Sequence, residues 1–196
     1  MTAVDICNLA LGRLGESAII SLEDPNEQAR ACARFYASTR DQALRDHLWS
    51  FAKRRAVLSE ILPPPTFGWG HHYQLPIDCL RVFALNREAE DLSTGDPPHT
   101  IEGRRLLTDE SGARIVYVAR TIDTGQYDAT FVEVLALLLA SKLTTILTGS
   151  RDTDQKFLNM YRMAMGTARR QDANEGRKDS ALPADSRFVA ARWRGV

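Results

Sequence analysis

Apolar residues recur at steps of three and four along four stretches of the chain, a spacing that places them on one side of an α-helix. Residues that start and stop helices flank these stretches, such as Thr2 before the first and Gly149 after the third. We therefore expect helices after Thr2, from Pro25 to about Trp49, from about Tyr127 to Gly149, and from Ser150 or Asp152 to near 174–176.

The third stretch is the most apolar part of the chain. Its apolar positions are Phe131, Val134, Leu135, Leu138, Leu139, Leu143, Ile146 and Leu147. They occupy too wide an arc of a helix for one neighbour to cover, so we expect cover from more than one side. Glu133 and Lys142 interrupt the stretch, which is also too short to cross a bilayer of about 30 Å, so we expect no membrane span.

The middle third of the chain has a different pattern, with short β-branched or aromatic runs between turn residues. Pro63-Pro64-Pro65 forces an extended connector ahead of these runs. The runs predict strands of a small antiparallel sheet at 72–75, 80–85, 104–108 and 114–119. The acidic segment 86–100 is expected to be a loop between two of them.

Together these patterns predict an α+β fold, mainly a helical bundle of about four helices with a small antiparallel β insertion and an extended C-terminal tail. The bundle is expected to comprise residues 1–62 and 121–176, and the insertion residues 63–120. Residues 177–196 are mostly polar and are expected to form a flexible C-terminal tail.

The charged residues are balanced. The chain of 196 residues has 25 Lys and Arg residues against 25 Asp and Glu residues, so its formal net charge is zero. A neutral chain has no overall basic field to attract DNA or anionic lipid, which disfavours free nucleic-acid binding. The cysteines, Cys7, Cys32 and Cys79, are odd in number and widely spaced. We therefore expect a reducing compartment and no disulfide bonds.

The sequence contains little that points to cofactor or metal chemistry. Nothing fits the phosphate-binding pattern G-x-x-x-x-G-K-[ST]. His71 and His72 are adjacent, and adjacent residues on a strand point to opposite faces, so the pair is unsuited to one metal ion. Cys79 follows Asp78 but lies between apolar residues, where nothing local would lower its pKa. We expect no cofactor, no metal and no enzymatic activity.

Glu133 is the carboxylate with the most unusual surroundings, because it lies on the most apolar helix. Burial there would raise its pKa and suit it to acid–base chemistry. A pair with an arginine of another helix is the more frequent reason for such a residue, and it is the interpretation we favour.

Two polar segments are candidates for contact with partners. The acidic segment carries Glu88, Glu90, Asp91 and Asp96. The tail carries Arg187, Phe188, Arg192 and Trp193. Arginine with aromatic residues is the composition of interface anchors, and exposed Phe and Trp side chains reduce solubility unless a partner covers them. A disordered terminus is the alternative for the tail.

Several blocks of the sequence, taken in order, carry a resemblance to a known family. They are 6–15 (ICNLALGRLG), the turn 21–25, the segment 27–51 ending in RDHLWSF, 73–76 (YQLP), 78–82 (DCLRV), 101–109 (IEGRRLLTD) and the helix 131–149. In this order they resemble the tail tubular protein A family, the head-to-tail adaptor proteins of tailed bacteriophages. Leu48 departs from the proline expected before the tryptophan, and the segment 86–100 matches nothing in the family.

The resemblance implies a structural virion protein. It implies twelve copies in a ring at the head–tail junction beneath the portal protein, enclosing the DNA channel in passive contact with double-stranded DNA. The ring would offer a platform to the downstream tail or nozzle protein. A neighbouring subunit would then cover part of the apolar helix. The tail would bind the portal, and the acidic segment would face the lumen or the nozzle.

Two other classes of function stay open. An adaptor with peptidoglycan-cleaving activity would use Glu133 or another carboxylate, although the sequence offers no convincing pair of acids for glycoside hydrolysis. A DNA-packaging or head-completion factor would bind DNA directly, and the neutral net charge weighs against it.

Overall fold

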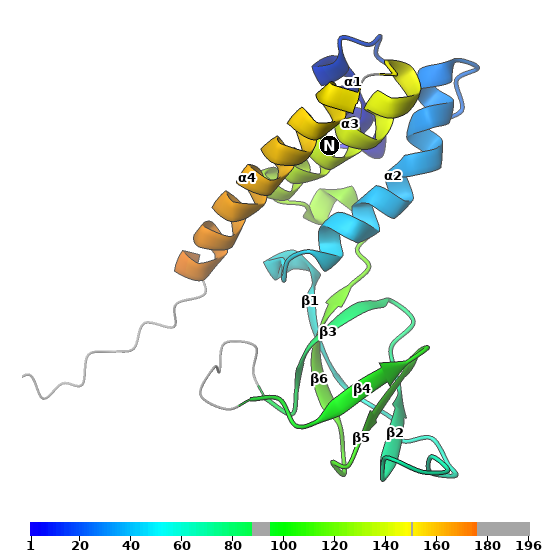
Figure 1. The fold of residues 1–196 in the computed structure, drawn as a ribbon, viewed down its shortest axis with the longest axis vertical. Coiled ribbons are helices and arrows are strands. Elements are labelled where there is room, and N and C mark those ends of the chain that lie inside the picture. The colour runs from blue at the N-terminus through cyan, green and yellow to red at the C-terminus, as the bar shows by residue number, and fades with distance from the viewer. Residues whose placement is uncertain (88–94, 150, 176–196) are drawn as a thin grey trace, which may run out of the picture.

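The computed structural model describes residues 1–87, 95–149 and 151–175. The molecule is elongated, with helices gathered at one end and strands at the other (Figure 1). The described part contains four α-helices and two antiparallel sheets of three strands each. The predicted α+β fold is therefore confirmed, with one more sheet than expected.

The described part of the chain forms four α-helices, and the residues just before the first three of them cap free backbone N–H groups. The helices are α1 (Ala3–Leu14), α2 (Glu27–Arg45), α3 (Ala129–Leu147) and α4 (Arg151–Glu175). Thr2 and Asp5 form a capping box at the start of α1. The side chains of Asn26 and Asp128 accept hydrogen bonds from the first turns of α2 and α3. Gly15 ends α1 with a left-handed φ of 76°.

The helix α2 ends earlier than predicted. It stops at Arg45, and the prediction of an end near Trp49 was wrong. The apolar residues that extend the pattern turn back on the helix, where the indole Nε1 of Trp49 donates a hydrogen bond to the carbonyl of Ala43 (3.0 Å). A short 3-10 helix, η1 (Ser50–Ala52), follows and leads into the first strand.

The helix α3 is the centre of the bundle. The helices α1, α2 and α4 all pack against it, and 12 of its 19 residues are buried (Figure 1). The expected cover from more than one side therefore comes from the chain itself, and a neighbouring subunit is not needed for it. Among the described helices, α3 alone is long and apolar enough to cross a membrane, and 67% of that apolar window is buried in the fold.

The β region consists of two sheets. In the first, β6 (Arg114–Ala119) lies between β1 (Lys53–Val57) and β3 (Cys79–Leu85). In the second, β5 (Arg105–Thr108) lies between β2 (His71–Gln74) and β4 (His99–Glu102). Many of their buried side chains form a core that includes Tyr73, Leu106 and Ile115. The Tyr73 hydroxyl also donates to the carbonyl of Glu110 and accepts from the backbone N–H of Gly112, which holds the turn before β6.

The four predicted strands correspond to β2, β3, β5 and β6, whereas β1 and β4 were not predicted. Both of these are edge strands with few buried side chains, so neither has the alternation of apolar and polar residues that marks a half-buried strand. The strand β1 pairs with β6 from Lys53 to Val57. The β region therefore begins at Lys53, ahead of the predicted start at 63.

We predict that Trp49→Ala lowers the free energy of unfolding by about 3–5 kcal/mol, measured by urea unfolding. Trp49 is 1% exposed, and its ring meets that of Phe131 at 5.0 Å between centroids, so truncation leaves a cavity between α2 and α3. The matched control is Phe67→Ala, which removes a ring that is 87% exposed and should change stability by less than about 0.5 kcal/mol. Equal effects of the two substitutions would contradict this assignment.

Candidate functional site

Most of the residues predicted to contact partners lie outside the described residues. These are Glu88, Glu90, Asp91, Arg187, Phe188, Arg192 and Trp193. Asp96 is described, and its Oδ1 accepts hydrogen bonds from Nε of Arg87 (2.6 Å) and from the backbone N–H of Leu85 (3.2 Å). It therefore anchors the acidic segment to the end of β3.

Glu133 pairs with Arg13, so the predicted ion pair between helices is confirmed. The pair links α3 to α1 across 120 residues of sequence. The Glu133 side chain is 52% exposed, so it is not buried in the apolar core of the bundle. A pair this exposed stabilises a fold by about 0–1 kcal/mol.

The two adjacent histidines face opposite sides of β2, as predicted. His71 lies on the outside, where its Nδ1 is 2.6 Å from Oε1 of Glu60. His72 is 8% exposed and points inward. Within residues 1–87, 95–149 and 151–175, no group of three or more His, Cys, Asp or Glu side chains is placed to hold a metal ion.

Two of the three cysteines, Cys79 and Cys7, are stabilised in the thiol form. Burial raises the pKa of Cys79 to about 11, although the nearby guanidinium groups of Arg104 and Arg45 oppose that shift. A hydrogen bond with Cys32 and burial both raise the pKa of Cys7. A nucleophilic cysteine requires a lowered pKa, so neither residue is suited to that chemistry at neutral pH.

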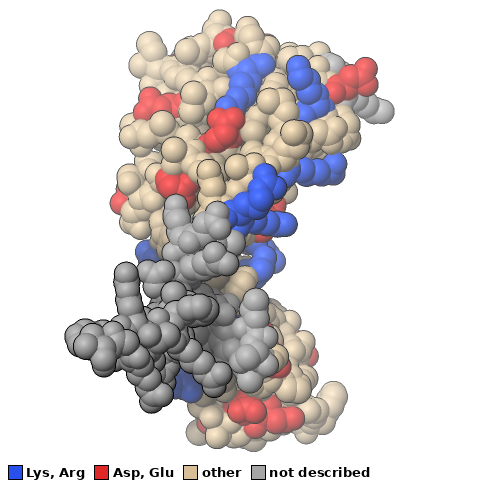
Figure 2. Space-filling model, turned by 90° about the vertical axis from the view of Figure 1, so that its left-hand side faces the viewer, with Lys and Arg blue, Asp and Glu red and all other residues tan. Residues whose placement is uncertain are grey.

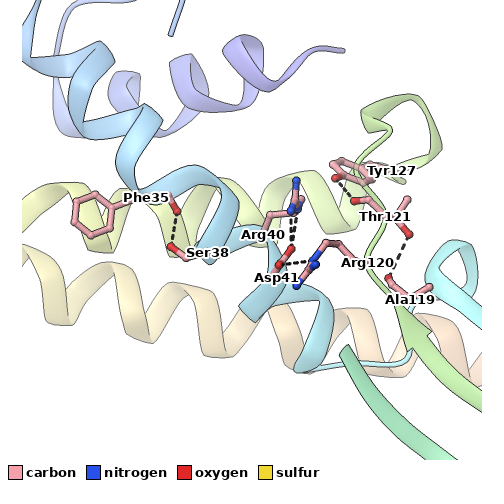
Figure 3. A network of polar contacts seen from close by, with 8 residues as sticks. All are labelled: Phe35, Ser38, Arg40, Asp41, Ala119, Arg120, Thr121 and Tyr127. Atoms are coloured by element: carbon pink, nitrogen blue, oxygen red, sulfur yellow. Dashed lines mark hydrogen bonds and ion pairs between the residues drawn. The ribbon is translucent and has the colours of Figure 1, made fainter. Parts of the chain in front are cut away.

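A polar network fixes the bundle against the β region (Figure 3). Asp41, near the end of α2, accepts hydrogen bonds from Arg40 at 2.7 and 2.9 Å and from Nε of Arg120 at 2.7 Å. Arg120 directly follows β6, so this carboxylate joins the helix to the sheet. The Tyr127 hydroxyl donates to the carbonyl of Thr121 at 2.7 Å, which holds the connection from β6 to α3.

A second set of contacts joins α4 to the end of α2. The Tyr161 hydroxyl donates to the carboxylate of Asp46, and Nη2 of Arg169 donates to the Asp46 carbonyl at 3.1 Å. Nη1 of Arg81 on β3 donates to the carbonyl of Arg45 at 2.8 Å. The C-terminal end of α2 is therefore held by both α4 and the first sheet.

Five of the twelve exposed large apolar side chains among the described residues lie on the β region. We call these five the apolar rim, which comprises Val57, Leu62, Phe67, Ile77 and Ile101, all between 45% and 87% exposed. Val57 and Ile77 line one hollow of about 430 Å³ with Leu58 and Leu75. Exposed apolar side chains that share a hollow are typical of a surface that binds another protein.

Charges on the bundle are mixed in sign. Figure 2 shows both acidic and basic side chains on this face of the bundle, and several Lys and Arg side chains gather on its part toward the β region.

The residues at the junction and in the apolar rim were not identified from the sequence. Asp41 and Arg120 are 79 residues apart, so no local spacing connects them. Ile77, between Pro76 and Asp78, could have been noticed as a lone apolar residue between turn residues.

Comparison with protein-family models found no match, and comparison with curated proteins found none either.

We predict that Asp41→Asn destabilises the protein by about 2–4 kcal/mol, because Arg40 is 7% exposed and would lose the partner of its buried charge. Urea unfolding measures the loss. Glu102→Gln, at an exposed position, is the matched control and should change stability by less than about 0.5 kcal/mol. If both substitutions are equally mild, Asp41 does not hold the junction.

We also predict a loss of stability at alkaline pH in which Tyr127 takes part. Burial raises the pKa of Tyr127 to about 12, whereas an unfolded tyrosine titrates near 10. Its contribution is therefore complete below pH 10 and is lost as the pH rises to about 12, because the unfolded chain releases the proton first. Urea midpoints measured between pH 8 and 11.5 should fall less steeply for Tyr127→Phe than for the wild type. Parallel curves would contradict the assignment.

Proposed function

We propose that this protein is a structural adaptor of a tailed bacteriophage that forms a ring at the head–tail junction beneath the portal protein. Twelve copies enclose the DNA channel in this arrangement and give the downstream tail or nozzle protein its attachment platform. The protein is then part of the virion and acts by binding its neighbours, without a cofactor and without catalysis.

The observation that carries this proposal is that the blocks of resemblance coincide with separate elements of the fold. The block 6–15 corresponds to α1 with its Gly15 end, and 27–51 to α2 followed by η1. The block 101–109 runs from Ile101 within β4 to Asp109, just after β5, and so includes the turn of that hairpin. Each of these blocks lies mostly within one or two consecutive elements of the fold, which supports the proposal.

The apolar rim supports a role in assembly. Its side chains are exposed to water in the single chain. A partner that covers them removes this apolar surface from water, which favours association. Each burial of this kind stabilises a complex by about 25 cal/mol per Å² of apolar surface, before the costs of association. A ring subunit needs such surfaces for its neighbours and for the components above and below it.

The balanced charge supports a role around DNA that moves. A channel lined by a strongly basic surface would hold the phosphates and slow the passage of the duplex. The chain has a net charge of zero, and each charge facing the lumen is repeated in every subunit. In this proposal, the acidic segment with Glu88, Glu90, Asp91 and Asp96 faces the lumen or the nozzle.

The alternatives have less support. Peptidoglycan cleavage would need a general acid with a second carboxylate beside it, and Glu133 is exposed and paired with Arg13. Direct DNA packaging would need a basic surface, and the face in Figure 2 is mixed in sign.

We predict that the purified protein joins the portal ring encoded in the same genome, in about the copy number of the portal, because ring symmetry repeats each contact. Light scattering on a sizing column, with the protein alone and mixed with the portal, measures the mass. In the proposal the tail binds the portal, so Phe188→Ala combined with Trp193→Ala should abolish the complex, whereas the control Asp185→Asn should not.

Two outcomes of the light-scattering measurement would contradict parts of the proposal. A protein that stays monomeric and does not bind the portal would refute the adaptor function, since that function consists of this contact. Binding that survives the loss of Phe188 and Trp193 would leave the adaptor but refute the role of the tail.

A further inference from the structure

A groove lies where the end of α2 meets the start of β3 and the turn between β4 and β5. Its volume is about 490 Å³. Its lining combines aliphatic side chains with arginines from four places in the chain, namely Arg45, Arg81, Arg104 and Arg120. We call it the arginine groove. No carboxylate side chain is among the described residues that line it.

Most of the positive charge in the arginine groove is not neutralised. Arg120 pairs with Asp41, which also pairs with Arg40. Among the described residues, Arg45, Arg81 and Arg104 have no carboxylate within ion-pair distance. Their hydrogen bonds are to backbone carbonyls: Arg81 donates to Arg45 and Arg104 to Pro76. Asp78, next to the groove, accepts a hydrogen bond from Tyr117.

The arginine groove is bordered by two edge strands. The order of the first sheet leaves one side of β3 unpaired with any described strand, and the same holds for β4 in the second sheet. Residues Cys79 to Val82 of β3 and Ile101 of β4 line the groove. Unpaired backbone N–H and C=O groups of an edge strand are able to bind an extended peptide.

We infer that the arginine groove binds an extended acidic segment of a partner protein, with aliphatic residues between its carboxylates. Guanidinium groups bind carboxylates through two parallel hydrogen bonds, and here several of them surround one groove. Leu75, Val82 and Ile101 offer contacts to aliphatic side chains of the same segment.

An extended peptide fits this groove better than DNA does. Side chains of two sheets and a helix enclose it, and a single strand of peptide fits such a space. A duplex instead requires a broad basic face on which many phosphates are contacted at once. The inference does not depend on the proposed ring, because the groove is formed within one chain.

The test uses a fluorescein-labelled peptide in which glutamate alternates with valine, with fluorescence anisotropy as the readout on the full chain. The wild-type protein should bind it, and the matched peptide with glutamine in place of glutamate should bind at least about tenfold more weakly. Arg45→Glu combined with Arg104→Glu should weaken binding by about tenfold or more, since two exposed charges are reversed. The charge-matched control, Arg30→Glu with Arg34→Glu, reverses arginines that lie away from the groove on α2 and should bind as the wild type does.

A second measurement avoids dependence on the folding of the variants. In NMR spectra of the wild-type protein, the peptide should shift the backbone amide signals of residues 79–82 and 101–104, and leave those of residues 27–34 unchanged. Equal binding of the glutamine peptide, equal loss in the control variant, or shifts only outside these residues would each overturn the inference. It would also be overturned if a duplex oligonucleotide bound at these residues and the peptide did not.

Discussion

The burial of α3 is the constraint on which both parts of the molecule depend. The other three helices each cover a portion of its surface, so none of them has a complete core without it. The first turns of α3 extend this packing to the junction, because Phe131 meets the rings of Trp49, Phe51 and Tyr127 at 4.7 to 5.1 Å between centroids. The position of the β region is thus set by the same helix that organises the bundle.

The junction is held by several interactions of different kinds. Aromatic packing acts on the connection from α2 to β1, and the carboxylate of Asp41 acts on the connection from β6 to α3. Asp46 holds α4 to the same end of α2. These interactions join the β region to the bundle at the C-terminal end of α2.

The sequence predicted the elements whose burial leaves a periodic pattern. All four helices and the four strands with buried residues were found, because their apolar spacing follows the period of the element. The edge strands β1 and β4 were missed because their side chains are largely exposed and carry no such pattern. The end of α2 was misplaced because Trp49 and Phe51 are buried in a turn, so apolar residues continued past the helix.

Prediction of the site was limited by sequence distance. The sequence predicted that Glu133 pairs with an arginine of another helix. It did not identify Arg13 as that arginine, because the two residues are far apart in the sequence. The arginine groove takes its side chains from α2, β3, the turn after β4 and the end of β6. Their proximity is created only by the fold, and no motif in the sequence records it.

The order of the elements along the chain has a consequence for biosynthesis. The β region is continuous in sequence, whereas the bundle is split, with α1 and α2 before the β region and α3 after it. On the ribosome, Ile6, Leu11 and Leu44 emerge about 100 to 140 residues before the helix that buries them is complete, which at typical rates is roughly 5 to 30 s. The β region is therefore complete while the first two helices still expose apolar faces, and synthesis of α3 allows the bundle to close.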